Sequence, residues 1–290
     1  MGPILCGVDF SDQSRRALFL AAALAGRLEV PLHVVTVIDP LLAEAAEIEY
    51  GHGRLETDTR RDLDAFVQAA VPEGSKVAAT LGKRTEVGEP SQMLLQIAAH
   101  EGASIVVVGT QGVGWVKRIW LGSTTMRLLR AAAVPVLAVP TRDGAAIADH
   151  RADLGFDRLL CGVDFSSASE AAARLGALLS SRLSVPMSLL HIEAPTPVKD
   201  TWKRVAASAL DLRVEKARRH LETLAAELPL RPVFAGVKTG KPADVLVEEA
   251  KAGGRALIVL GLGSASQARP GATAALVLSH ATSPVLAVPA

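Results

Sequence analysis

The chain repeats itself, and this repeat limits its possible folds more than any other feature. Residues 6–11 (CGVDFS) recur letter for letter as residues 161–166, at an offset of 155 residues. Gly88 and Pro90 recur as Gly240 and Pro242 at an offset of 152, and residues 135–140 recur as 284–289 at an offset of 149. The falling offset indicates one unit of about 145 residues used twice, with two three-residue losses in the second copy.

Composition supports two globular domains and argues against nucleic acid as a partner. Hydrophobic residues make up 49% of the 290 residues and charged residues 21%, so each copy can bury a core of its own. The 31 Lys and Arg residues nearly balance the 30 Asp and Glu residues, which argues against binding a polyanion through bulk charge. Aromatic residues are only 3%, too few for a base-stacking platform.

The sequence shows no sign of export or membrane insertion. No basic leader precedes the first apolar run, and the longest uncharged window, residues 270–290, is interrupted by prolines. The two cysteines, Cys6 and Cys161, occupy the same place in each copy and are predicted to be small core residues rather than redox groups. We therefore expect a cytoplasmic protein with no membrane partner.

Each copy alternates short apolar runs with helical patterns, which is typical of a doubly wound α/β sandwich. Parallel strands need right-handed helical crossovers, so we expect two tandem five-stranded parallel-sheet domains, residues 1–141 and 156–290. For each we assume a flavodoxin-like strand order, 3-2-1-4-5. In the first copy the predicted strands are 4–9, 32–38, 76–81, 104–109 and 136–139, and the predicted helices are 12–27, 55–70, 88–100 and 123–132, with a loop after Pro40.

Sheets of this kind bind ligands where the strand order reverses, at the carboxyl ends of the first and fourth strands. Asp9 follows the first strand, and a glycine-rich loop runs from Gly109, at the end of the fourth, to Gly122. Ser123 and Thr124 then open a helix, whose free N–H groups and two hydroxyls suit phosphate oxygens. An ionised Asp9 accepts hydrogen bonds only, so it suits a ribose hydroxyl or an amino group.

The spacing Gly109-x2-Gly112-x9-Gly122-Ser123, together with residues 8–11 (VDFS), resembles the ATP-binding universal stress proteins. The resemblance covers almost all of both copies and implies an adenine-nucleotide alpha hydrolase-like, Rossmann-like fold and a role in stress survival. It implies that Asp9 and Val37 contact adenine or ribose. It also implies that a group of glycines and hydroxyls holds the triphosphate: Gly109, Gly112, Gly122, Ser123 and Thr124. ATP, with or without Mg²⁺, is the expected cofactor.

The second copy departs from this pattern. Ser264 stands where glycine is expected, the loop to Gly271 is three residues shorter, and Ala272 replaces the hydroxyl of Ser123. The residues that remain are Asp164, Gly261, Gly263, Gly271 and Thr273. We therefore expect the first copy to bind ATP and the second to serve mainly as its packing partner. The resemblance also implies pairing through the last strands, here within one chain as a pseudo-dimer, with a homodimer of chains left open.

Several enzyme classes lack their motifs. The chain has no Gly-x4-Gly-Lys-Ser/Thr, no Gly-x-Gly-x2-Gly after a first strand and no Gly-x-Ser-x-Gly, and its seven histidines lack metal-ligand spacing. No catalytic residue is therefore predicted, and any ATP hydrolysis should be slow. Two alternatives remain open: a nucleotide-free scaffold, and an enzyme of the same superfamily that transfers phosphoryl or adenylyl groups.

Overall fold

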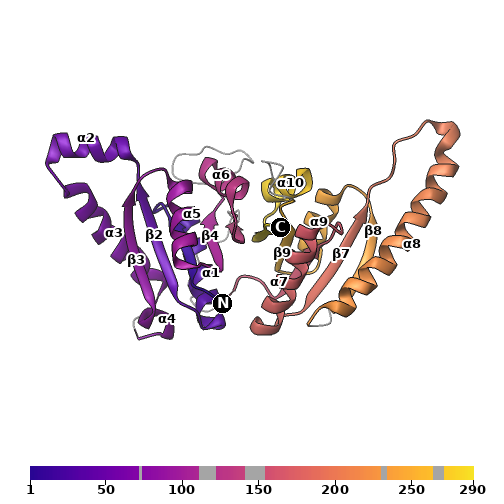
Figure 1. The fold of residues 1–290 in the computed structure, drawn as a ribbon, viewed down its shortest axis with the longest axis horizontal. Coiled ribbons are helices and arrows are strands. Elements are labelled where there is room, and N and C mark those ends of the chain that lie inside the picture. Colours follow the sequence, from indigo (N-terminus) through magenta and orange to yellow (C-terminus); the bar gives the residue numbers. More distant parts are fainter. Residues whose placement is uncertain (72–73, 111–121, 141–153, 230–233, 264–270) are drawn as a thin grey trace. The chain divides into compact units, whose positions relative to one another are not determined.

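A computed structural model of the chain describes residues 1–71, 74–110, 122–140, 154–229, 234–263 and 271–290. The chain divides into two compact units, Met1–Gly155 and Phe156–Ala290. Figure 1 shows that each unit is a twisted sheet with helices packed on both faces. The two units therefore correspond to two copies of one α/β architecture.

The first unit has the predicted strand order, β3-β2-β1-β4-β5, and all of its described strand pairs are parallel. Its strands are β1 (Ile4–Val8), β2 (Leu32–Ile38), β3 (Leu81–Val87), β4 (Ile105–Gly109) and β5 (Val136–Val139). Its helices are α1 (Asp12–Leu28), α2 (Pro40–Tyr50), α3 (Arg54–Ala70), α4 (Lys76–Ala79), α5 (Pro90–Glu101) and α6 (Ser123–Ala131). The order reverses between β1 and β4, so a crevice forms at their carboxyl ends.

Two pairs of helices bury the sheet of the first unit. Helix α1 packs on β1 and β4 beside α3, while α5 packs on β1 and β2 beside α6. Because right-handed crossovers that run in one direction lie on one face, α1 and α3 share a face and α5 and α6 share the other. The central strand is buried from both sides, and Ile4, Leu5 and Cys6 are fully buried.

Two local predictions for the first unit are wrong. The segment after β2 is helix α2 rather than a loop, because Asp39 caps it by accepting from Leu41 N–H at 2.8 Å and Pro40 suits the first helical turn. The third strand is 81–87 rather than 76–81, because Ser75 caps the short helix α4 instead. Strand β3 (LGKRTEV) is charged because it lies at the edge of the sheet, where pairing with β2 decides its structure.

The second unit repeats this topology with the order β10-β9-β6-β7-β8. Its strands are β6 (Arg158–Gly162), β7 (Met187–Glu193), β8 (Phe234–Thr239), β9 (Ala256–Gly261) and β10 (Val285–Val288), and its helices are α7 (Ser167–Leu183), the 3-10 turn η1 (Asp200–Trp202), α8 (Lys203–Glu227), α9 (Pro242–Ala252) and α10 (Ala272–His280). Helix α8 packs on β7 and β8, and α9 packs beside α10.

Both cysteines lie in the central strands and are buried, as predicted. Burial raises the pKa of both thiols, that of Cys161 to about 12, so neither is a thiolate at neutral pH. The cysteines therefore belong to the core and not to a reactive site.

No helix in the described part of the chain combines the length and the apolar character needed to cross a membrane.

Candidate functional site

A tight turn places Asp9 at the carboxyl end of β1. Its Oδ1 accepts hydrogen bonds from the backbone N–H of Ser11 at 3.1 Å and from the Ser11 hydroxyl at 2.5 Å. The Ser11 hydroxyl in turn caps α1 by accepting from Ser14 N–H at 3.1 Å. Phe10 reaches the left-handed region with φ 64° to complete the turn. These bonds hold the carboxylate in place while leaving its second oxygen, Oδ2, outside the turn.

Helix α6 begins beside the end of β4. The N–H of Gly122 donates to the carbonyl of Thr110 at 2.7 Å, and the Thr125 hydroxyl donates to the carbonyl of Gly109 at 2.8 Å. The N-cap residue, Gly122, offers no side chain to the first turn, so no side-chain hydrogen bond caps this helix. Among the residues that the structure describes, no side chain caps this first turn, so its N–H groups and the positive end of the helix dipole suit an anion.

These elements enclose a cavity of about 340 Å³ at the switch point of the sheet. This volume falls within the usual range for small-molecule sites, roughly 300–1,000 Å³. The cavity brings together residues from six elements and their connections: Gly7, Val8, Asp9, Ser14, Val35, Val37, Pro90, Leu94, Val108, Gly109, Gly122, Ser123, Thr124 and Thr125. One wall is apolar, and the other carries a carboxylate and the start of α6.

Six of the seven residues predicted for the first site line this one cavity: Asp9, Val37, Gly109, Gly122, Ser123 and Thr124. Gly112 lies outside the described residues. Gly109 also has a packing reason to be glycine, because a Cβ there would lie 3.1 Å from the backbone carbon of Gln13 in α1. Gly122 has a φ of −58°, which any residue adopts, so its lack of a side chain matters for space rather than for backbone shape.

Sequence reasoning missed the apolar wall of the cavity. Val35, Leu94 and Val108 line it, and Leu94 approaches Gly7 so closely that a Cβ on Gly7 would lie 2.8 Å from it. A signal was available, because Val35 and Val37 are two residues apart on β2 and so face the same side of the sheet. The position of Leu94 depends on how α5 packs, which no motif indicates.

The second unit has the matching cavity, with a volume of only about 90 Å³. It is lined by Gly162, Val163, Asp164, Ser169, Ile192, Pro242, Leu246, Leu260, Gly261, Thr273 and Ala274. Larger side chains occupy it, since Ile192 and Leu260 stand at the positions of Val37 and Val108. Of the residues predicted for the second site, Asp164, Gly261 and Thr273 line this cavity, whereas Gly263 and Gly271 are not among its lining residues.

Charged groups around the two cavities differ. In the first unit, Glu89 caps α5 and accepts from Arg127 of α6 at 2.9 Å. Partial burial would raise the pKa of Glu89, but hydrogen bonds from Ser91, Gln92 and Arg127 outweigh it and lower that pKa. Lys241 stands at the equivalent position of the second unit. Arg127 is therefore paired with a carboxylate, and of the described residues the first turn of α6 offers an anion its N–H groups and hydroxyls.

Asp164 repeats the turn of Asp9 in the second unit. Its Oδ1 accepts from Ser166 N–H at 3.0 Å and from the Ser166 hydroxyl at 2.5 Å. Desolvation alone would raise the pKa of Asp164, but the hydrogen bonds from Ser166 and Ser169 outweigh it and hold that pKa below its ordinary value. The turn is thus conserved between the two copies, whereas the cavity beside it is not.

Comparison with known proteins agrees with this geometry. The model of the "Universal stress protein family" matches residues 1–140 and again residues 155–289. A universal stress protein of Mycolicibacterium smegmatis is 32% identical over 299 residues, which cover 98% of this chain and 96% of that protein. One from Mycobacterium bovis is 28% identical and covers 94% of this chain and 90% of its own length.

The fold is also that of a solved relative. A universal stress protein from Archaeoglobus fulgidus superposes with a TM-score of 0.69 at 20% identity, over 99% of this chain and 98% of that one. The family match covers both copies. The sheet order, the Asp turn and the glycine before the last helix recur in each copy. The chain therefore belongs to the universal stress protein family, with two of its domains in tandem.

Proposed function

We propose that this protein is an ATP-binding regulator of stress response, with the nucleotide held by the first domain, residues 1–141. One observation carries the proposal: the uncapped first turn of α6 and the carboxylate of Asp9 line the same cavity. A carboxylate and an anion-binding helix end suit a ligand that carries both hydroxyls and phosphates. The second domain, residues 156–290, is mainly a partner in a pseudo-dimer.

The apolar wall suits the adenine ring. Val35, Val37, Leu94 and Val108 present branched side chains to the cavity, so a flat aromatic base would bury its faces against them. Asp9 would accept a hydrogen bond from a ribose hydroxyl through Oδ2, since Oδ1 is held by Ser11. The carboxylate needs no rearrangement to do so, because the turn already fixes it.

The start of α6 suits the phosphates. Ser123 and Thr124 would add hydroxyl donors to the free N–H groups of the first turn, and Gly122 leaves room for phosphate oxygens to approach the backbone. The hydroxyl of Thr125 is engaged with the Gly109 carbonyl and so positions the helix. Mg²⁺ would accompany the nucleotide through its phosphates.

The described lining of the cavity suits binding better than catalysis. It contains no His, Lys, Arg or Glu side chain, and its one carboxylate, Asp9, already accepts two hydrogen bonds from Ser11. Phosphoryl transfer needs a group that orients the nucleophile and a cation that meets the developing charge. Hydrolysis of ATP by this domain should therefore be slow at most.

The pseudo-dimer part of the proposal rests on two edge strands. Each of β5 and β10 is the last strand in the sheet order of its own unit, and such a strand presents a row of N–H and C=O groups for pairing on its outer side. Pairing β5 with β10 within one chain would satisfy these groups. A cytoplasmic location fits a nucleotide-dependent role of this kind.

Calorimetric titration of the full chain with ATP tests the binding site. We expect about one ATP per chain, and at least a tenfold loss of affinity in Gly122→Val because the isopropyl group fills the space beside the α6 N-terminus. Gly271→Val is the matched control: Gly271 has the equivalent place in the second unit, and a Cβ there meets nothing within 4 Å.

The outcomes separate the possible sites. No heat with the wild-type chain contradicts nucleotide binding and favours a scaffold. Equal affinity in wild type and Gly122→Val moves the site away from α6. A loss in Gly271→Val with no loss in Gly122→Val assigns the nucleotide to the second domain instead.

A further inference from the structure

Two helices, α2 and α8, expose large apolar side chains that their own domains do not bury. On α2, Leu41, Ile48 and Tyr50 are 75%, 81% and 72% exposed, and among its residues only Ala46 is buried. Leu42, which is also exposed, and Tyr50 lie on the side of α2 that faces α3, whereas Leu41 and Ile48, seven residues apart, lie on another side of the helix. We call Leu42 and Tyr50 the α2 surface. A cluster of large apolar side chains in water is the usual mark of an interaction site.

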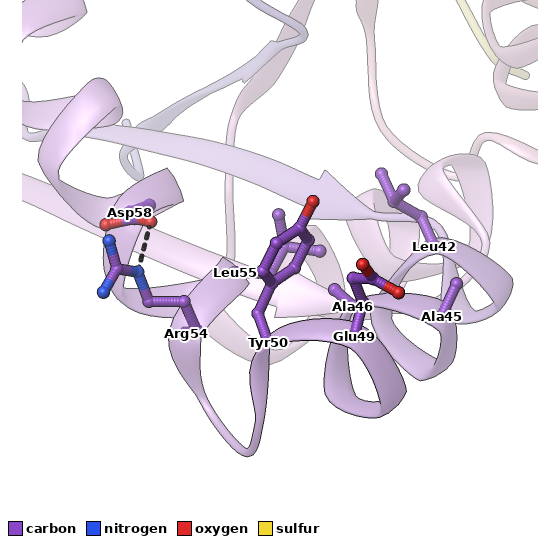
Figure 2. A pocket seen from close by; sticks show the side chains of 8 residues that line it. All are labelled: Leu42, Ala45, Ala46, Glu49, Tyr50, Arg54, Leu55 and Asp58. Carbon is purple, nitrogen blue, oxygen red and sulfur yellow. Dashed lines mark hydrogen bonds and ion pairs between the residues drawn. The ribbon is translucent and has the colours of Figure 1, made fainter.

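A groove adjoins the α2 surface. It has a volume of about 720 Å³ and lies between α2 and α3, lined by Leu42, Ala45, Ala46, Glu49, Tyr50, Arg54, Leu55 and Asp58. Figure 2 shows Tyr50, Leu55 and Leu42 around it, with the carboxylate of Glu49 beside them and Arg54 turned to Asp58. The groove is therefore apolar with an acidic rim, and it is wide enough for a large side chain.

The second exposed surface lies on α8. Trp202, Val205 and Leu212 are 60%, 59% and 73% exposed, and with the exposed Ala209 they follow the spacing of one helical stripe. We call this set the α8 surface: Trp202, Val205, Ala209 and Leu212. Only Ala217, Leu221 and Leu224 of α8 are buried, so the N-terminal half of this helix buries none of its side chains. The stripe is thus not needed for packing α8 on its own sheet.

The charges of the two surfaces are complementary. Helix α2 carries three glutamates and no Lys or Arg, and one of these glutamates, Glu49, lines the groove. Residues 199–216, which contain the α8 surface, carry five Lys or Arg against three Asp or Glu. The groove beside α2 is apolar with an acidic rim, and the α8 surface is an apolar stripe with basic residues beside it. The two surfaces therefore match in apolar character and in charge, and opposite charges steer such surfaces together.

We propose that the α2 surface of one chain binds the α8 surface of a second copy, with Trp202 entering the groove between α2 and α3. A Trp that fills a pocket is a common anchor of a protein interface, and Arg204, two residues further on, would meet the carboxylate of Glu49. Each copy carries one surface of each kind, so the contact is between unlike surfaces. The proposal is independent of nucleotide binding.

Sedimentation velocity on the full chain tests this. Over about 1 to 100 µM, the range of weak interfaces, we expect reversible self-association that weakens as salt rises, because salt screens exposed charges. Leu42→Glu, in the lining of the groove, and Leu212→Glu, on the α8 stripe, each place a charge on one surface and should weaken association at least tenfold. Both side chains are exposed, so the fold should be kept, which circular dichroism checks.

A mixture of the two variants gives the sharpest result. The Leu42→Glu chain keeps its α8 surface and the Leu212→Glu chain keeps its α2 surface, so an equimolar mixture should associate more strongly than either variant alone. Ala207→Glu is the matched control, because Ala207 is exposed on α8 about 180° from the stripe, and it should behave as wild type.

Three results overturn the proposal. The wild-type chain stays monomeric throughout the concentration range, or only one of the two variants weakens association, or the mixture associates no more strongly than either variant alone. The second result would assign the contact to two like surfaces instead. Titration with ATP stays unchanged in all three variants if the two proposals are as independent as the structure indicates.

Discussion

At the scale of single residues, the two oxygens of the Asp9 carboxylate have different roles, one in the turn and one proposed for ligand contact. Asp9 uses Oδ1 to hold the turn through Ser11, and Asp164 uses its own Oδ1 in the same way through Ser166. The motif VDFS is therefore explained by the turn alone, in both copies. The sequence does not show that Oδ1 of Asp9 accepts the hydrogen bonds of the turn whereas Oδ2 does not.

Asp9→Asn tests this division of labour. The amide keeps an oxygen for the bonds from Ser11, so the free energy of unfolding should change by less than about 1 kcal/mol. Its NH2 group cannot accept from a ribose hydroxyl, so ATP affinity should fall about tenfold in calorimetry. Asp164→Asn should leave ATP affinity unchanged. Unchanged affinity in Asp9→Asn would remove the carboxylate from the site.

Asp164 also predicts a dependence of stability on pH. Its pKa is lower in the folded chain than the value of about 3.9 for a free aspartate. Its contribution to stability is therefore complete above that free value and is lost as pH falls through the lower, folded value. In urea unfolding followed from pH 6 to pH 2, wild type should lose more stability than Asp164→Asn; parallel curves would contradict the role of this carboxylate.

At the scale of elements, the difference between the two sites is a matter of side-chain volume. The replacement of Ser123 by Ala272 and the shorter loop were both visible in the sequence. The larger effect was not: Leu260 fills the space beside Gly162, where a Cβ would lie 2.6 Å from its Cδ2. Cavity size depends on how side chains from separate elements meet, and no local pattern carries that information.

Giving the second cavity the smaller side chains of the first should let the second domain bind ATP, and the reverse change should weaken binding by the first domain. The triple variant Ile192→Val, Leu260→Val, Ala272→Ser enlarges the second cavity and restores a hydroxyl, so calorimetry should show a second ATP per chain. The two truncations should each cost about 1 kcal/mol of stability. Val108→Leu, the reverse change in the first unit, should lower ATP affinity about tenfold. A stoichiometry that stays at one would mean that the volume of the cavity and the hydroxyl at position 272 do not limit binding in the second domain.

The burial and pairing of the elements also explain which strand and helix predictions the structure confirms. Buried strands such as β1, β2 and β4 were predicted within about one residue, because an apolar run bounded by turn residues has few alternatives. Strand β3 was misplaced because its residues are charged and its structure comes from pairing with β2. Helix α2 was missed because almost all of its surface is exposed and it shows no buried stripe.

At the scale of the whole molecule, the last strand of each unit directs half of its backbone groups away from the other strands of that unit. Val106 N–H donates to the carbonyl of Pro135 and Thr110 N–H to that of Val139, so alternate amides of β5, those of Val136 and Ala138, point away from β4. By the same alternation, the amides of Val285 and Ala287 point away from β9.

Hydrogen exchange measured residue by residue tests the proposed pseudo-dimer. If β5 and β10 pair within the chain, these four amides should exchange as slowly as those of Leu137 and Leu286, which point toward the neighbouring strand. Fast exchange at the four positions would contradict the pairing. The protection should not depend on protein concentration, which distinguishes pairing within one chain from association of two.

The sequence by itself determined that the chain is one unit used twice and that each unit is a five-stranded parallel sheet, whose assumed order of 3-2-1-4-5 the structure confirms. The sequence also predicted a candidate site between β1 and β4, where the structure has a cavity. These features follow from periodicity, turn chemistry and the handedness of crossovers, which act on neighbouring residues. Tertiary structure alone decided that Gly109 is glycine for the sake of α1, that Ile192 and Leu260 narrow the second cavity, and that α2 and α8 expose apolar faces. Each of these depends on which distant side chains meet in space, and packing of that kind leaves no mark on any single stretch of sequence.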